Sequence, residues 1–259
     1  MKIKKYSLYL IDLDGTMYNG NEKIKYAKEF IDYLNSNNID YLFLTNNSTK
    51  TESDVVKKLK SLDIETSEKN IFTSSEAAAL YMKKKSYKKS YLIGEDGLRE
   101  TLLRNDISIT NKDDAQAVVV GLDRNLTYEK LKQACFIIRN GAEFIGTNPD
   151  KLLPTEEGMA PSNGGQVKYL EYVTGVKPTV IGKPNKIIMD LAISKFNYNM
   201  EDIVMVGDNY DTDIMSGINA GIDTIHVQTG VTIKEALKAK AKQPTYSIKN
   251  LSELINNFN

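Results

Sequence analysis

Along most of the chain, short apolar runs alternate with longer segments in which apolar residues recur at helical spacing. The runs 7–12 ("SLYLID") and 40–45 ("DYLFLT") are continuous enough to be strands buried on both faces, and residues 27–38 between them have the spacing of a helix. Such alternation is typical of parallel sheets whose strands are joined by helices. The pattern therefore predicts an α/β fold.

The same pattern continues toward the C-terminus. Further strands are predicted at 90–94, 117–122, 143–148, 178–182, 201–208 and 223–230, and further helices at 50–63, 74–84, 96–104, 127–140, 165–175, 185–196, 213–221 and 250–258. Residues 146–165, "GTNPDKLLPTEEGMAPSNGG", are rich in Gly, Pro, Asn and Thr and predict a long ordered loop. We expect a core domain made from 1–79 and 179–259, with an α/β domain inserted at 80–178.

Charge and composition exclude some classes of function. The 259 residues include 34 acidic and 34 basic side chains, so no general attraction to a nucleic acid polymer or an anionic membrane is expected. The lysine-rich run 83–89 favours a solvated helix end. The single cysteine, Cys135, fits a reducing compartment. With neither a secretory leader pattern nor an apolar stretch of membrane length, we expect a cytoplasmic protein.

Polar side chains follow four of the predicted strands, at the edge where open parallel sheets bind their ligands. The residues concerned are Asp12 and Asp14, then Thr45, Asn46 and Asn47, then Lys183, and finally Asp208, Asn209 and Asp213. Carboxylates gathered in one crevice repel each other unless a cation lies between them. Oxygen ligands suit Mg²⁺, which also binds phosphate oxygens, so the pattern indicates a magnesium site for a phosphorylated substrate.

These residue types can carry phosphoryl transfer. Asp12 can attack phosphorus and form an acyl phosphate, while Asp14, two residues further along, faces the same side and can transfer protons. Lys183 and the Thr45 hydroxyl can hold phosphoryl oxygens. The single histidine, His226, lies within an apolar strand pattern, which favours a structural role over a catalytic one.

Four motifs together closely resemble those of the haloacid dehalogenase (HAD)-like hydrolase superfamily. They are "DLDGT" (12–16), "LTNNS" (44–48), "GKP" (182–184) and "GDNYDTD" (207–213). Within the superfamily, "GTNPD" (146–150) and the insertion are similar to the NagD or p-nitrophenylphosphatase branch. The resemblance implies a Rossmann-like core, an α/β cap domain and phosphatase activity.

The resemblance also implies roles for individual residues. It makes Asp12 the nucleophile and Asp14 the general acid and base. Mg²⁺ would be held by the Asp12 carboxylate, the Asp14 backbone carbonyl and Asp208, with Asp213 in support. The implied phosphate-binding residues are Thr45, Asn46 and Lys183, with Asn47 and Asn209 lining the pocket.

The expected function is Mg²⁺-dependent hydrolysis of small phosphomonoesters, such as nucleotide monophosphates, sugar phosphates or p-nitrophenyl phosphate, through an aspartyl phosphate. A phosphomutase on the same scaffold and a signalling domain resembling a phospho-Asp receiver stay open as alternatives. The expected partner is a small phosphorylated metabolite, and the protein is expected to be a monomer or a homodimer formed through the cap. Asn148, Asp150 and Glu156 are candidates for contacts with the leaving group, although a role in shaping the loop is favoured.

Overall fold

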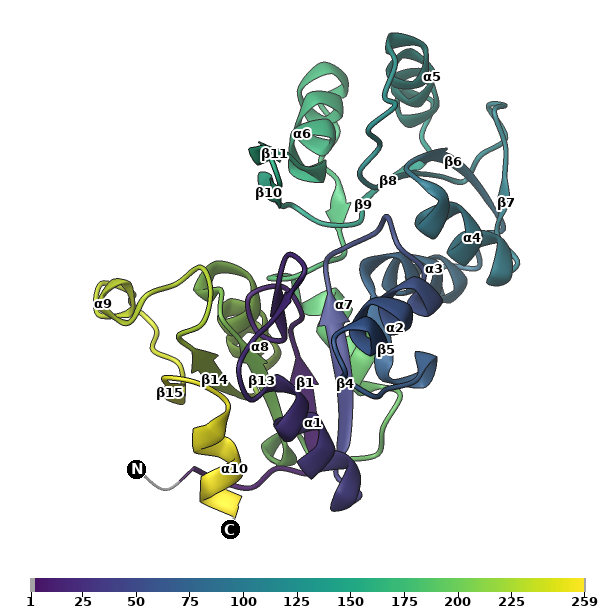
Figure 1. Cartoon of the computed structure of the whole chain (residues 1–259). Helices are drawn as coiled ribbons and strands as arrows, with labels where there is room; N and C mark the ends of the chain where they lie inside the picture. Colours follow the sequence, from purple (N-terminus) through teal and green to yellow (C-terminus); the bar gives the residue numbers. More distant parts are fainter. Residues whose placement is uncertain (1–2, 259) are drawn as a thin grey trace. The chain divides into compact units, whose positions relative to one another are not determined.

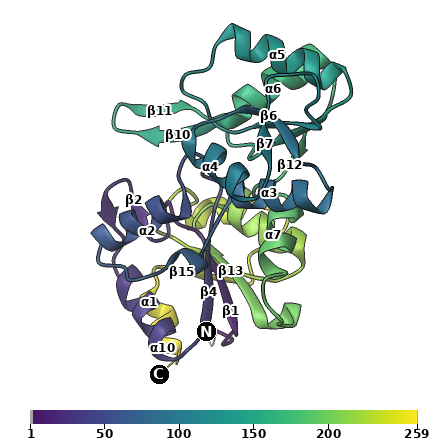
Figure 2. The ribbon, with the colours of Figure 1, turned by 90° about the vertical axis from the view of Figure 1, so that its right-hand side faces the viewer.

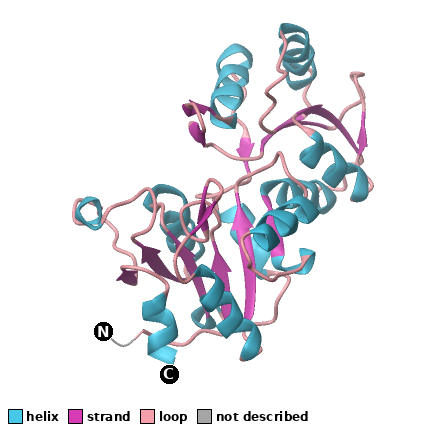
Figure 3. Ribbon diagram, viewed as in Figure 1, coloured by secondary structure: helices cyan, strands magenta, loops and turns pink. Residues whose placement is uncertain are grey.

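Strands and helices alternate along the computed structural model, which describes residues 3–258 (Figure 1, Figure 3). Most of the strands form two parallel sheets, and the others form two short hairpins, so the predicted α/β class is confirmed. The described chain divides into two compact units: residues 3–45, 52–72 and 183–258 form the first, and residues 46–51 and 73–182 form the second. The limits predicted for an inserted domain, 80–178, stay a prediction.

The sheet of the first unit brings together strands that are far apart in the sequence. Its order is β15 (Tyr246–Ile248), β14 (Asp223–Val227), β13 (Ile203–Gly207), β1 (Leu8–Ile11), β4 (Asp40–Thr45) and β5 (Ile71–Thr73). β1 runs parallel to both of its neighbours, with Leu10 opposite Met205 on one side and Leu42 on the other. The carboxyl ends of β1, β4 and β13 therefore lie next to one another, so the residues that follow them share one edge of the sheet.

Both faces of this sheet are covered, which explains why β1 is apolar without alternation. Tyr9 and Ile11 belong to the same buried cluster as Phe30 of α1 and Leu254 of α10. On β1 the intervening residue Leu10 is also fully buried. The helices of the first unit are α1 (Ala27–Ser36), α2 (Glu52–Ser61), α7 (Lys186–Ile193), α8 (Met215–Ala220), α9 (Lys234–Leu237) and α10 (Ser252–Phe258).

The second unit has its own sheet and its own core (Figure 2). The strand order is β12 (Thr179–Val180), β9 (Glu143–Gly146), β8 (Ala117–Val120), β6 (Lys89–Ile93) and β7 (Ser108–Ile109), and the strands run parallel. Val118 and Val120 pack with Ile137 of α5 and Val167 of α6. The helices of this unit are α3 (Ser74–Lys84), α4 (Asp96–Arg104), α5 (Tyr128–Arg139) and α6 (Asn163–Thr174).

The prediction of one long loop over residues 146–165 is wrong. The segment contains an antiparallel hairpin of β10 (Leu152–Thr155) and β11 (Gly158–Pro161), and α6 already begins at its end. Pro154 and Pro161 argued against strands, but prolines are tolerated in short strands that have a free edge. At the tip, the Thr155 hydroxyl donates to the Gly158 carbonyl at 2.7 Å and closes the turn.

Other differences from the predicted elements concern short segments. The pattern missed β5, β7, β15 and α9, together with the hairpin of β2 (Tyr18–Asn19) and β3 (Glu22–Lys23), because two to four residues are too few to show a period. The helix predicted at 213–221 is present as α8 (Met215–Ala220), but its first two residues belong instead to a π-helical turn, η3 (Tyr210–Ile214). Among residues 3–258, we find no helix with the length and apolar character needed to span a bilayer.

Candidate active site

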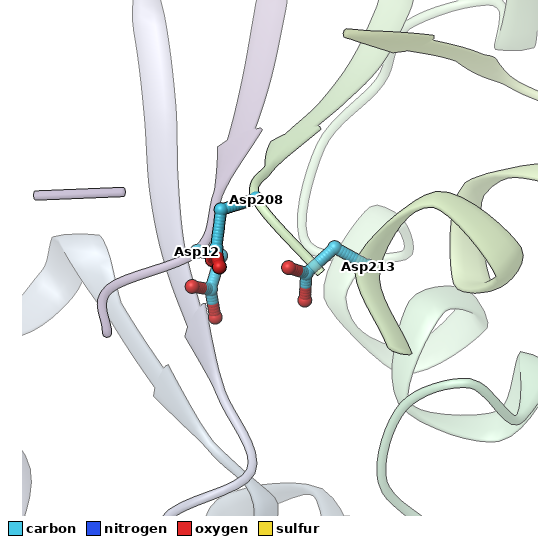
Figure 4. A group of neighbouring side chains, drawn as sticks. All are labelled: Asp12, Asp208 and Asp213. Carbon is cyan, nitrogen blue, oxygen red and sulfur yellow. The ribbon is translucent and has the colours of Figure 1, made fainter. Parts of the chain in front are cut away.

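Three carboxylates meet at the shared strand edge of the first unit. Asp12 directly follows β1, Asp208 directly follows β13, and Asp213 lies in the π-helical turn after it. One oxygen from each of the three lies within 4.8 Å of the others, and all three residues are buried. Figure 4 shows their side chains converging on one small space. The strand order, rather than closeness in sequence, creates this cluster.

Lys183 joins two of the three acids. Its Nζ lies 2.5 Å from Asp12 Oδ1 and 2.8 Å from Asp213 Oδ1, and it also donates to the Leu44 carbonyl at 2.9 Å. Burial by itself would lower the pKa of the Lys183 amine, but the charges of Asp12 and Asp213 outweigh burial and raise it. Lys183 is therefore a permanently charged, fully buried cation within the cluster.

One ammonium group does not neutralise three buried carboxylates. Burial, followed by the neighbouring charge of Asp213, raises the pKa of Asp12 well above its ordinary value and that of Asp208 to about 7. Asp213 is already engaged, because Oδ1 accepts from Lys183 and Oδ2 accepts from the Asn209 N–H at 3.0 Å. A second cation would therefore relieve the repulsion among the three carboxylates, and the hard oxygen atoms of Asp12 and Asp208 fit a small divalent one such as Mg²⁺.

The raised pKa of Asp208 predicts that the metal-free protein loses stability as the pH rises. An unfolded aspartate releases its proton near pH 4, whereas folded Asp208 holds it up to about pH 7. The contribution is complete below about pH 4 and is lost toward pH 7, because unfolding in that range releases a proton. In EDTA, we expect a lower midpoint of thermal unfolding at pH 8 than at pH 5.5. The Asp208→Asn variant should show a shallower decline, and an equal decline would contradict this origin.

The Asp208 carboxylate is closely surrounded by the segments that contain Gly15 and Gly230. Its Oδ2 accepts from the Val231 N–H at 2.6 Å, and its Oδ1 accepts from the Thr16 hydroxyl at 3.3 Å. A Cβ at Gly15, where φ is +90°, would lie 2.4 Å from the Asp208 carboxyl carbon, and a Cβ at Gly230 would lie 2.1 Å from Oδ2. Any side chain at either glycine would therefore displace the carboxylate.

The sequence did not single out this enclosure. Thr16 is the last residue of the motif "DLDGT", and this position could have identified it as a residue of the site. Gly230 and Val231 follow β14 in the stretch "QTGV" and act through space and a backbone amide, neither of which marks a sequence.

A substitution at Gly230 tests the close fit. Gly230→Ala should lower the affinity for Mg²⁺ about 10–100-fold, as changes around metal ligands do, because Asp208 must move. Isothermal titration with Mg²⁺ measures this loss. Gly165→Ala in α6 is the matched control, because its Cβ would have no neighbour within 4 Å. Equal Mg²⁺ affinities for the two variants would show that the Asp208 site tolerates the displacement.

Asp14 lies outside the three-carboxylate cluster. Asp14 is exposed, and the Tyr18 hydroxyl donates to its Oδ2 at 3.3 Å. The surrounding protein removes part of the water around the Asp14 carboxyl group, and this desolvation raises its pKa. The charge of Lys58 and the hydrogen bond from Tyr18 act in the opposite direction. The two acids of the first motif thus have different environments, as separate roles require.

Thr45 and Asn209 also belong to the first unit. Thr45 is buried at the end of β4, the strand beside β1. The Asn209 side chain accepts from the Asp211 N–H at 3.0 Å and so caps the π-helical turn that carries Asp213. Asn209 therefore shapes this turn, while its contact with a substrate stays a prediction.

Asn46 and Asn47 belong to the second unit, and their phosphate contacts stay predictions. The Asn46 amide donates to both oxygens of Asp150, at 3.0 and 3.2 Å, and the Asn148 amide donates to the Asn46 carbonyl at 2.8 Å. Asn47 accepts from the Thr49 N–H at 2.8 Å. Both asparagine side chains therefore already have partners within this unit.

Comparison with known proteins supports one class. The family model for haloacid dehalogenase-like hydrolases matches residues 9–108, and a HAD-hydrolase-like model matches residues 180–254. The chain is 48% identical to an acid sugar phosphatase from Staphylococcus haemolyticus, over 98% of this chain and 97% of that protein.

Solved structures agree with these matches. A double mutant of a thermostable NPPase from Geobacillus stearothermophilus is 48% identical, with a TM-score of 0.90 over 97% of this chain and 98% of that one. A 4-nitrophenylphosphatase from Thermotoga maritima is 36% identical, with a TM-score of 0.91 over 97% of each chain.

The chain belongs to the haloacid dehalogenase-like hydrolases, in the branch of phosphatases that includes these relatives. The predicted family, the Rossmann-like fold and the enzyme class, a phosphatase, are thereby confirmed.

Proposed function

We propose that this phosphatase hydrolyses small phosphomonoesters with Mg²⁺, through a phosphorylated Asp12. The observation that carries the proposal is the position of the buried Asp12 carboxylate. It contacts the Lys183 amine and lies in one cluster with the carboxylate of Asp208. Sugar phosphates, p-nitrophenyl phosphate and nucleotide monophosphates are the proposed substrates. The names of the relatives, acid sugar phosphatase and 4-nitrophenylphosphatase, support the first two.

In the first step, an oxygen of Asp12 bonds to phosphorus while the bond from phosphorus to the leaving oxygen breaks. The contact of Lys183 with Asp12 Oδ1 orients the carboxylate, so that Oδ2 is the proposed nucleophile. Asp14 donates the proton that the leaving oxygen needs, which its raised pKa favours. Mg²⁺, held by Asp12 and Asp208, would neutralise charge on the phosphoryl oxygens.

In the second step, water attacks phosphorus, and the bond to Asp12 breaks. Asp14, now a carboxylate, takes the proton of that water, and inorganic phosphate leaves. Asp213 acts indirectly, because it fixes Lys183 at 2.8 Å and so keeps this charge beside Asp12 in both steps.

The test is phosphate release from a panel of phosphorylated metabolites and p-nitrophenyl phosphate, with Mg²⁺ and with EDTA. Acid quenching during turnover, followed by peptide mapping, should place phosphate on the peptide that contains Asp12. One oxygen from labelled water should enter each phosphate released. Full activity in EDTA would refute the role of the metal, and transfer of phosphate between substrate positions without label would favour a phosphomutase.

A further inference from the structure

His226 lies in the core of the first unit, one residue before the end of β14. It is fully buried, and in the sheet it stands opposite Gly207, the residue before Asp208. Both ring nitrogens have partners: Nε2 lies 2.9 Å from the Thr232 carbonyl oxygen, and Nδ1 lies 3.1 Å from Ser247 Oγ. The ring is therefore held in one orientation.

The chemistry of these partners fixes where the proton of the ring resides. A carbonyl oxygen only accepts, so Nε2 of His226 donates to Thr232. Ser247 then donates to Nδ1 of a neutral ring, and its oxygen accepts from the Gln228 amide at 3.2 Å. Burial lowers the pKa of His226, in keeping with a neutral ring. The result is a directed chain of hydrogen bonds from Gln228 to Thr232.

Thr232 connects this chain to the carboxylate cluster. Its N–H donates to the Asp208 carbonyl at 3.2 Å, and its hydroxyl accepts from the Tyr210 N–H at 2.9 Å. The preceding residue, Val231, donates its N–H to the Asp208 carboxylate. A shift of Thr232 would therefore alter the environment of Asp208 directly.

The two ends of the segment 228–232 are anchored differently. Gln228 continues the sheet by donating its N–H to Ile248, and the Thr229 hydroxyl donates to the Gly15 carbonyl at 2.7 Å. The later end is held by other groups, because Val231 and Thr232 form hydrogen bonds with Asp208, Tyr210 and His226. Of these three partners, His226 is the one that lies on a strand, because Asp208 follows β13 and Tyr210 lies in η3.

We propose that His226 is a positioning residue for the metal site. By holding the Thr232 carbonyl, it aims the Val231 N–H at the Asp208 carboxylate and so sets the affinity of the site for Mg²⁺. This role rests on the proposed function only in assuming that Asp208 binds the cation. Without the Nε2 donor, the buried Thr232 carbonyl loses its partner, and the segment 231–232 is expected to move to recover one.

Two amide substitutions separate positioning from burial. In His226→Gln, the amide reaches the place of Nε2 and can donate to Thr232, whereas in His226→Asn it reaches only the place of Nδ1. We expect isothermal titration with Mg²⁺ to show affinity within about 5-fold of the wild type for His226→Gln, and about 10–100-fold weaker binding for His226→Asn. At saturating Mg²⁺, kcat of His226→Asn should fall far less than the affinity does.

Thermal unfolding in EDTA shows which of the variants are folded. Should His226→Asn fail to fold, Ser247→Ala serves as a second variant. That variant frees Nδ1 while leaving the Nε2 donor, so its Mg²⁺ affinity should stay near that of the wild type. Equal affinities for the Gln and Asn variants, or a 10-fold loss in Ser247→Ala, would overturn the positioning role. Absence of Mg²⁺ binding by the wild type would instead refute the proposed function.

Discussion

Replacing Asp12 with asparagine should lower kcat by at least about 10⁴-fold, because the amide keeps the shape of the side chain but cannot attack phosphorus. The variant should remain folded. An amide at position 12 removes repulsion from Asp208 and Asp213, while Lys183 keeps its contact with Asp213. Phosphate release from p-nitrophenyl phosphate and thermal unfolding in EDTA measure the two effects.

Asp211→Asn is the matched control for this substitution. Asp211 lies in the same acidic motif as Asp208, but its side chain is 74% exposed and pairs with Lys240 at the surface. Such a pair contributes little, so kcat should stay within about 2-fold of the wild type. Retention of a tenth or more of the activity in Asp12→Asn would exclude Asp12 as the nucleophile.

Replacing Lys183 with methionine should destabilise the metal-free protein by about 3–5 kcal/mol at pH 8, because it leaves buried carboxylates without their cation. The loss should be smaller at pH 5.5, where Asp12 and Asp208, whose pKa values are already raised, can take up protons. In the presence of Mg²⁺, kcat should fall about 10²–10³-fold with the loss of a positioned charge. Urea unfolding and steady-state kinetics measure the two losses.

A second substitution tests whether charge is the cause. The double variant Lys183→Met with Asp213→Asn should regain part of the stability at pH 8, because it removes one of the carboxylates left without a partner. Lys186→Met is the surface control, since Lys186 pairs with Asp190 near solvent, and its effect should be under about 0.5 kcal/mol. A loss below about 1 kcal/mol in Lys183→Met would mean that the cluster does not depend on this cation.

The longer elements could be predicted because their apolar periods are determined locally. The helices at 74–84 and 96–104 and the strand at 40–45 agree with the structure to the residue. The hairpin at 152–161 could not be predicted, because its strands are held by pairing with each other and lack an apolar face. The short strands β5 and β15 exist for a similar reason, as additions to the edges of a sheet that other strands begin.

The candidate site was predictable where chemistry-bearing side chains follow strands. Asp12, Lys183, Asp208 and Asp213 were all chosen in this way, and the structure brings their side chains together. Their roles in catalysis stay proposals. The contribution of Val231 was beyond sequence reasoning, because a backbone amide looks the same at every position of the chain.

The sequence by itself determined the alternation of strands and helices and the residue types at the strand ends, because periodicity and motif chemistry are properties of neighbouring residues. Only the tertiary structure decided which strand ends meet, which oxygens of Asp12 and Asp213 share Lys183, and which loop encloses Asp208. It also gave His226 a specific partner, where the sequence indicated only a buried ring. The physical reason is that charge repulsion, desolvation and hydrogen-bond direction depend on distances between segments up to about 200 residues apart, which order along the chain does not encode.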